Sequence, residues 1–304
     1  MPAAPDEFPP PYAVDVAMSQ RSHERIGERR TDDTWLAETW ADPGTRVLVL
    51  AGGRFPLTDD RDAVRWLAPA EAPEGERLLL GERQGVVHYA VLPTKAFRAP
   101  DDWGQLRELG PDLAAVDRGF LVQAQAMWEW RRAHRFCGRC GGGLVASRGG
   151  YVLQCEACGR QHFPRTDPAV IMLVTDGERA LLGRQAVWPE GRFSTLAGFV
   201  DPGESLEDAV AREVREEAGI EVTEVTYFGN QPWPFPSSLM VGFFARATST
   251  EITIDDDEIE DARWFTREEM RAETEAGQLV LPGGISISRS LIEAWYGGPL
   301  PGQW

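Results

Sequence analysis

Residues 198–220, GFVDPGESLEDAVAREVREEAGI, carry acidic residues at a spacing that suits divalent-metal chemistry. Glu213, Glu216 and Glu217 are three and four residues apart, so a helix would bring their carboxylates to one side. Mg2+ prefers oxygen ligands, and such an ion activates water and neutralises charge on phosphoryl groups. The stretch therefore predicts a metal site for phosphoryl chemistry; the alternative is an acidic, solvated helix face.

The surrounding residues predict the elements that would position these carboxylates. Asp201-Pro202-Gly203 is typical of a turn, and the chain then reads as a helix from about Ser205 to Gly219. Like charges at this spacing destabilise a helix by roughly 0.2–0.5 kcal/mol per pair, and Arg212, four residues before Glu216, offsets part of this cost. Apolar residues recur every four positions and predict the buried side: Leu206, Val210 and Val214.

The four cysteines predict a second metal site. Cys137, Cys140, Cys155 and Cys158 follow the spacing C-x2-C-x14-C-x2-C, which is typical of a zinc ribbon. Four thiolates fill a tetrahedral site, so the expected Zn2+ ion, one per chain, is structural. Two disulfides or a redox dithiol are the alternatives. The flanking His134 and His162 are interpreted as surface or packing residues, because four thiolates already suffice.

A proline-rich segment, NQPWPFPSS at 230–238, follows the acidic helix. Three prolines alternate with Trp233 and Phe235, which predicts a stiff, extended stretch with aromatic faces. Its position after the expected phosphate site favours a platform for a flat ring. The alternative is a loop whose aromatic side chains pack into the core.

Composition limits the class of protein. The chain has 304 residues, 42% of them hydrophobic, and a net charge of −17, which argues against broad non-specific binding to nucleic acid. No apolar run approaches the ~18 residues that span a bilayer, so no membrane partner is expected. The first residues lack the pattern of a signal peptide, and a cytoplasmic location is expected.

Pattern changes along the chain predict its organisation. We expect a flexible N-terminus over 1–20, a mixed α/β domain over 21–133, a zinc ribbon over 134–164 and a mixed α/β domain over 165–304. Within them, strands are predicted at 46–55, 78–93, 169–175 and 239–247, with a Gln-Gly turn inside 78–93. Helices are predicted at 113–134 and near 288–295.

Together these motifs resemble a known family. Residues 198–220 follow the pattern G-x5-E-x7-R-E-U-x-E-E-x-G-U (U aliphatic), hereafter the Nudix box. In its combination of a zinc ribbon, this box and the segment QPWPFPSS, the chain is similar to the NADH pyrophosphatase family of NudC-like Nudix hydrolases. The resemblance implies three parts in chain order: a Nudix-like N-terminal α/β domain, the zinc ribbon, and a Nudix fold with a mixed sheet between helices. It implies metal-dependent cleavage of NAD(H) to nicotinamide mononucleotide and AMP, removal of NAD caps from RNA, and a homodimer.

The resemblance also implies roles for residues of the catalytic domain. Two or three Mg2+ or Mn2+ ions would be held by the carbonyl of Ala197 and by Glu213, Glu216, Glu217 and Glu258. Glu217 would orient or deprotonate the attacking water, with Glu213 and Glu216 as catalytic neighbours. Arg212 and Glu204 would support the glutamates. Substrate contacts are implied for Phe163, Phe199, Gln231, Pro232, Trp233, Pro234, Phe235, Pro236, Ser237, Ser238 and Ser288.

Some positions leave alternatives open. Asn230 stands where the family commonly has Ser, and one of the acidic residues at 255–257 is an alternative to Glu258 as the outer ligand. Phe163 follows the ribbon, where it would reach a partner subunit's site or serve as a core aromatic. Alternative functions are hydrolysis of diadenosine polyphosphate or ADP-ribose, a non-catalytic NAD sensor, and a nucleic-acid adaptor, which the sparse basic residues of the ribbon disfavour.

Overall fold

A computed structural model describes residues 16–19, 22–94, 96–110, 112–254 and 259–301. The chain divides into two compact units. One contains Met1–Ser19, Asp167–Pro232 and Ser238–Trp304, and is called the catalytic unit below. The other, the N-terminal unit, contains Gln20–Thr166 together with Trp233–Ser237.

The catalytic unit is built on a six-stranded mixed sheet. The order is β12-β13-β9-β10-β14, and β11 pairs with β9. β9 runs parallel to β13 and antiparallel to β10 and β11. The strands are β9 (Asp167–Thr175), β10 (Ala180–Arg184), β11 (Leu196–Phe199), β12 (Val222–Trp233), β13 (Ser238–Ala247) and β14 (Asp261–Phe265).

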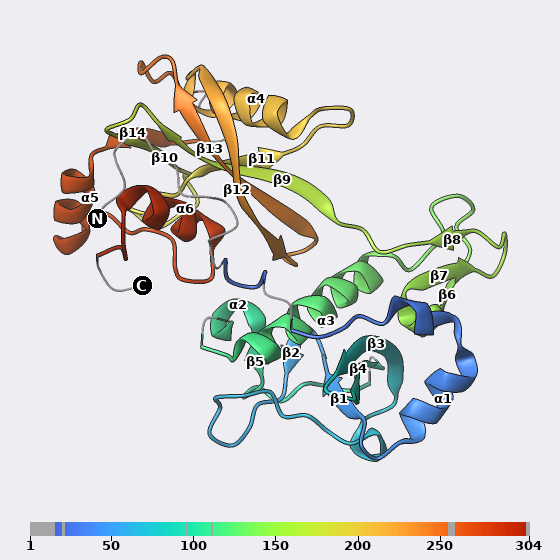
Figure 1. The fold of residues 1–304 in the computed structure, drawn as a ribbon. Helices are drawn as coiled ribbons and strands as arrows, with labels where there is room; N and C mark the ends of the chain where they lie inside the picture. Colours follow the sequence, from blue (N-terminus) through green and yellow to red (C-terminus); the bar gives the residue numbers. More distant parts are fainter. Residues whose placement is uncertain (1–15, 20–21, 95, 111, 255–258, 302–304) are drawn as a thin grey trace. The chain divides into compact units, whose positions relative to one another are not determined.

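Alternate residues of β9 enter two different cores, since side chains of a strand point to opposite faces in turn. Val170, Met172 and Val174 pack with α4 (Leu206–Ala218). Ile171 and Leu173 pack with α6 (Ile287–Tyr296) and with Met270 of α5 (Arg267–Glu275). Figure 1 shows α4 and α6 on opposite sides of the sheet. The predicted sheet between helices is confirmed.

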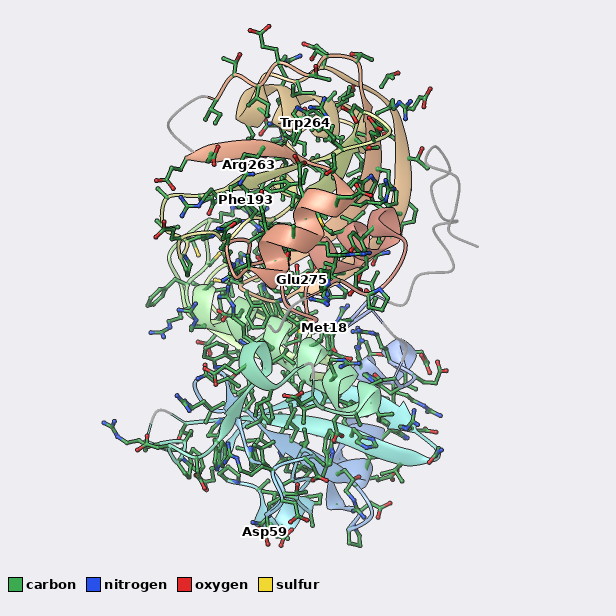
Figure 2. All side chains as sticks on the ribbon, turned by 90° about the vertical axis from the view of Figure 1, so that its left-hand side faces the viewer. Met18, Asp59, Phe193, Arg263, Trp264 and Glu275 are labelled. Carbon is green, nitrogen blue, oxygen red and sulfur yellow. The ribbon has the colours of Figure 1, made fainter. Side chains whose placement is uncertain are left out.

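Two further contacts complete this unit. The guanidinium of Arg263 on β14 lies 5.9 Å from the ring centroid of Phe193, and both residues are labelled in Figure 2. The same guanidinium is ion-paired with Glu273 at 2.8 Å. At the start of the described chain, Val16 and Met18 are each only 4% exposed. The sequence pattern places these two residues in a flexible terminus, whereas burial of their apolar side chains ties 16–19 to the catalytic unit.

The N-terminal unit holds a three-stranded sheet in the order β1-β4-β3. β3 (Gly75–Arg83) and β4 (Val86–Pro93) form the predicted hairpin, whose turn residues Gln84 and Gly85 both have positive φ. β1 (Arg46–Val49) runs parallel to β4, and β2 (Arg54–Phe55) pairs with β5 (Gly104–Gln105). The helices are η2 (Gly27–Thr31), α1 (Asp33–Ala41), η3 (Pro69–Glu71), α2 (Leu106–Leu109) and α3 (Ala115–Ala133).

The cysteine segment follows α3 as a small antiparallel sheet in the order β6-β7-β8. Its elements are β6 (Leu144–Ser147), η4 (Arg148–Gly150), β7 (Val152–Cys155) and β8 (Gln161–His162). It clusters with the N-terminal unit. In the described part of the chain, no helix has the length and apolar character needed to cross a membrane.

Candidate active site

Local signals set both ends of α4, which carries the box glutamates. The side chain of Ser205 accepts a hydrogen bond from the backbone N–H of Asp208 at 3.1 Å and caps the first turn. Gly219 ends the helix in the left-handed region at φ 68°, where glycine is favoured. Ala209, Val210, Val214 and Ala218 are fully buried, which fixes the side of α4 that faces the sheet.

The carboxylate of Glu213 lies directly against β11. A Cβ atom built on Gly198 would stand 1.9 Å from Cδ of Glu213 and 2.1 Å from each carboxylate oxygen. Only glycine permits this approach, which explains the first fixed position of the box. Glu213 and Glu217 are 7% and 5% exposed, so two of the three predicted catalytic carboxylates are buried beside the sheet.

Arg212 links the turn, the strand and the helix of the box. Its Nε and Nη2 donate to the two carboxylate oxygens of Glu204 at 2.8 Å each, a bidentate pair. Its Nη1 donates to Glu213 at 2.8 Å and to Glu216 at 2.9 Å, and Nη2 also donates to the carbonyl of Phe199. The hydrogen bonds from Arg212 lower the pKa of Glu204 to about 2. Arg212 thus holds Glu204, Glu213 and Glu216 by hydrogen bonds, and its supporting role in catalysis stays a prediction.

The donor set of α4 fits a hard divalent cation. Glu213, Glu216 and Glu217 offer carboxylate oxygens from one side of the helix, and β11, which carries the carbonyl of Ala197, lies against Glu213. Among the described residues these three glutamates do not by themselves form a convergent ligand group. Glu213 and Glu216 both accept a hydrogen bond from Nη1 of Arg212. Glu258, the predicted outer ligand, lies outside the described residues.

Gln231, predicted to bind substrate, has its side chain fully buried in the catalytic unit. Its Nε2 donates to the carbonyls of Ala17 at 2.6 Å and Ile285 at 2.7 Å, and its Oε1 accepts from the N–H of Ile287 at 2.9 Å. The side chain thus joins the end of β12 to the start of α6 and to the segment 16–19. No local pattern could have indicated Ala17 and Ile285 as partners, because they are distant in sequence.

Ser288, also predicted as a substrate contact, is 1% exposed. Its Oγ accepts hydrogen bonds from the backbone N–H and the hydroxyl of Thr195, at 3.2 and 2.8 Å, and lies 2.8 Å from Oγ of Ser194. Ser194 and Thr195 immediately precede β11, so this hydroxyl cluster anchors the strand that reaches Ala197. Sequence reasoning missed both residues, which have no motif of their own.

The remaining aromatic candidates differ in exposure. Phe199 is 60% exposed at the end of β11, and Phe163 is 59% exposed just after β8, so neither is a core residue. Trp233 and Phe235 pack edge to face with ring centroids 5.2 Å apart. Within the N-terminal unit, the guanidinium of Arg107 lies 5.8 Å from the Phe235 ring. The other predicted contacts of this segment differ in exposure: Pro234 is buried, Pro236 is exposed, and the half-buried ones are Pro232, Ser237 and Ser238.

The four cysteines come together as predicted. The Sγ atoms of Cys137, Cys140, Cys155 and Cys158 all lie within 4.8 Å of one another. A Cβ on Gly142 would come within 3.0 Å of Sγ of Cys155, so the chain closes tightly around the sulfurs. A hydrogen bond from the backbone N–H of Arg139 lowers the pKa of Cys137 to about 5. Four convergent thiols with such donors fit a tetrahedral zinc ion.

Comparison with protein families places both motifs. Residues 165–281 match the NUDIX domain, and residues 132–163 match the NADH pyrophosphatase zinc ribbon domain. A NAD-capped RNA hydrolase NudC from Mycobacterium bovis is 40% identical over 300 residues, which cover 91% of this chain and 94% of that protein. The chain belongs to the NADH pyrophosphatase family of Nudix hydrolases. It is therefore a hydrolase, and its family implies a divalent metal ion for catalysis.

Two further curated relatives and one solved structure are also similar to parts of this chain. NAD-capped RNA hydrolase NudC from Stutzerimonas stutzeri is 42% identical over 86% of this chain and 91% of its own length. NAD-capped RNA hydrolase NUDT12 from Macaca fascicularis is 46% identical over 60% of this chain and 42% of its own length. A solved Nudix hydrolase from Nitrosomonas europaea matches with a TM-score of 0.44 at 23% identity, over 55% of this chain and 95% of that chain.

Proposed function

We propose that this Nudix hydrolase cleaves the pyrophosphate bond of NADH and NAD+ to nicotinamide mononucleotide, reduced when NADH is the substrate, and AMP. The observation that carries the proposal is the conjunction of three features in one chain: the four-cysteine ribbon, the intact Nudix box and the segment QPWPFPSS. In the reaction a water oxygen bonds to one phosphorus, the bridging P–O bond breaks, and the water proton leaves to a base.

The residues of α4 supply that base and the metal ligands. Glu213, Glu216, Glu217 and Glu258 would hold Mg2+ or Mn2+, two or three ions, with the carbonyl of Ala197. When bound, these ions neutralise charge on the pyrophosphate and activate water. Glu217 takes the water proton, and its burial favours a role at the reacting centre. Arg212 holds Glu204, Glu213 and Glu216 in place through the hydrogen bonds described above.

The aromatic residues hold the flat rings of the substrate. Phe199 offers a largely exposed ring next to the metal ligands. A nucleotide contact by residues 231–238 is proposed from the family resemblance of QPWPFPSS alone. Gln231 contributes by fixing that segment, because its side-chain atoms bind the unit's own backbone. Ser288 fixes the strand that carries Ala197 in the same way. The two residues therefore hold the elements that carry the proposed site.

NAD-capped RNA is a second substrate that the comparisons favour. The curated relatives compared above are all named NAD-capped RNA hydrolases. The NAD cap carries the same pyrophosphate bond, so the same glutamates would cleave that bond. We propose that the enzyme is cytoplasmic. Chromatography of the reaction products tests which compound is the substrate. NADH, NAD+, ADP-ribose and NAD-capped RNA are offered separately, in equal amounts, with Mg2+ or Mn2+.

We expect AMP and the nicotinamide mononucleotide from NADH and NAD+, and RNA with a 5′-monophosphate from the capped RNA. Cleavage of ADP-ribose alone would retain the Nudix chemistry and refute the substrate. Tight binding of NADH without cleavage, in the presence of either metal, would identify a sensor instead.

We further infer a homodimer in which Phe163 serves the partner's site. The exposure of this ring, directly after β8, supports the proposal. Mixed preparations of Glu217→Gln and Phe163→Ala test it, because a mixed dimer would contain one site with both native residues. Recovery of about a quarter of wild-type activity on mixing supports sharing, and no recovery places Phe163 with its own subunit or outside the site.

A further inference from the structure

One side chain beside the cysteines has no assigned role. Nε2 of His162 lies 3.4 Å from Sγ of Cys137, within the range of a nitrogen–sulfur hydrogen bond. His162 is the last residue of β8 and pairs with Leu153 of β7, two residues before Cys155. The ribbon's own sheet therefore sets the direction of the imidazole toward the sulfurs.

The environment of Cys137 requires such donors. A dication bound by four thiolates leaves a net charge of about −2, and N–H groups directed at sulfur spread that charge. Cys137 is 3% exposed, so water does little of this work. The backbone N–H groups of Arg139 and Cys140 also donate to its sulfur. His162 is the side-chain member of this set.

His162 does not need to be a ligand itself. The four sulfur atoms already converge within 4.8 Å of one another, and a structural zinc ion takes four ligands. The neighbouring histidine behaves differently: Nδ1 of His134 lies 2.9 Å from the carbonyl of Trp130, at the end of α3. His134 is therefore a matched control that flanks the ribbon without contacting a cysteine in the described contacts.

We propose that His162 donates its Nε2–H to the thiolate of Cys137 and so stabilises the bound zinc ion from outside its coordination shell. The role explains why this histidine ends β8, immediately before the exposed Phe163. Neighbouring residues of an extended chain point in opposite directions, so His162 faces the sulfurs while Phe163 faces outward.

Zinc release from the full-length protein tests the proposal. The protein is mixed with excess chelator and a zinc-sensitive dye, and the rate is compared among wild type, His162→Phe, His162→Gln and His134→Gln. Loss of an outer donor costs about 10-fold or more in metal affinity, so we expect roughly 10-fold faster release from His162→Phe. His162→Gln retains an N–H near the position of Nε2 and should release zinc at close to the wild-type rate, as should His134→Gln.

Cobalt substitution separates the outer donor from a ligand. With Co2+ in the ribbon, the sulfur-to-cobalt charge-transfer band of His162→Phe should move to lower energy with the intensity of four thiolates unchanged. A wild-type band with the intensity of three thiolates would make His162 a ligand and overturn the proposal, as would equal release rates for His162→Phe and wild type. If His162→Phe does not fold, His162→Asn replaces it, because its amide is too short to reach Nε2, and it should release zinc faster than His162→Gln.

Discussion

Gly198→Ala tests the contact between β11 and the buried glutamate most sharply. The added Cβ would stand 1.9–2.1 Å from the carboxylate of Glu213, whereas real Cβ atoms essentially never come within 3.0 Å of another heavy atom. The carboxylate must therefore move by roughly 1 Å, and a misplacement of this size costs about 100-fold in rate. We expect kcat/KM for NADH to fall by about that factor, with a stability loss of about 1–3 kcal/mol from overpacking.

The assay measures kcat/KM at several Mg2+ concentrations beside thermal unfolding. Gly298→Ala is the control, because an added Cβ at Gly298 has no neighbour within 4 Å among the described atoms. If Gly198 acts through Glu213, then Gly198→Ala should cost little more in a Glu213→Ala background, where the clash is gone. Near wild-type kcat/KM for Gly198→Ala alone, or full additivity of Gly198→Ala and Glu213→Ala, would show that Gly198 does not act through Glu213.

Four other changes have defined outcomes. Glu217→Gln should lower kcat by 100-fold or more, since a positioned base contributes about 10²–10⁴-fold, with unchanged thermal unfolding; normal turnover would remove the assignment. The hydrogen bonds from Arg212 lower the pKa of Glu204 from 4.5 to about 2, so their stabilisation is complete above pH 4.5 and is lost as pH falls toward 2. Acid unfolding of Arg212→Gln should lack that pH dependence. Burial lowers the pKa of His23 from 6.5 to about 4, so the stability of the protein is retained above pH 6.5 and declines as pH falls toward 4. In His23→Phe, the unfolding temperature measured from pH 7 to 4 should depend less on pH. Gln231→Leu should destabilise the protein by about 1–3 kcal/mol, because three buried backbone groups lose their hydrogen-bond partner. The same variant should raise KM for NADH more than it lowers kcat. An unchanged denaturation midpoint would contradict the expected loss of stability.

Features encoded by neighbouring residues could be predicted from the sequence. Ser205 and Gly219 bound α4 because capping and the left-handed C-terminus depend on a few adjacent residues. The hairpin around Gln84 and Gly85 follows from turn chemistry in the same way. The four cysteines converge because their spacing already contains the two short knuckles of the ribbon.

Features that depend on the tertiary fold could not be predicted. Gln231 binds Ala17 and Ile285, 214 and 54 residues away, and no sequence pattern indicates either contact. The expected substrate contact of Ser288 stays a prediction, while its buried hydroxyl accepts hydrogen bonds from Thr195, a contact that no sequence pattern indicates. The family resemblance indicated which positions matter at this site, whereas only the packing shows by which contacts they act.

In the proposed function, the glutamates of α4 and a divalent ion together catalyse hydrolysis of the pyrophosphate of NADH. Chromatography of a reaction with NADH and Mg2+, run with wild type, with Glu217→Gln and with wild type plus chelator, tests it most directly. We expect equal amounts of reduced nicotinamide mononucleotide and AMP from wild type, formation of both at least about 100-fold slower with Glu217→Gln, and neither product with chelator. Product formation at near the wild-type rate with Glu217→Gln or with chelator, or cleavage at any other bond of NADH, would contradict this assignment.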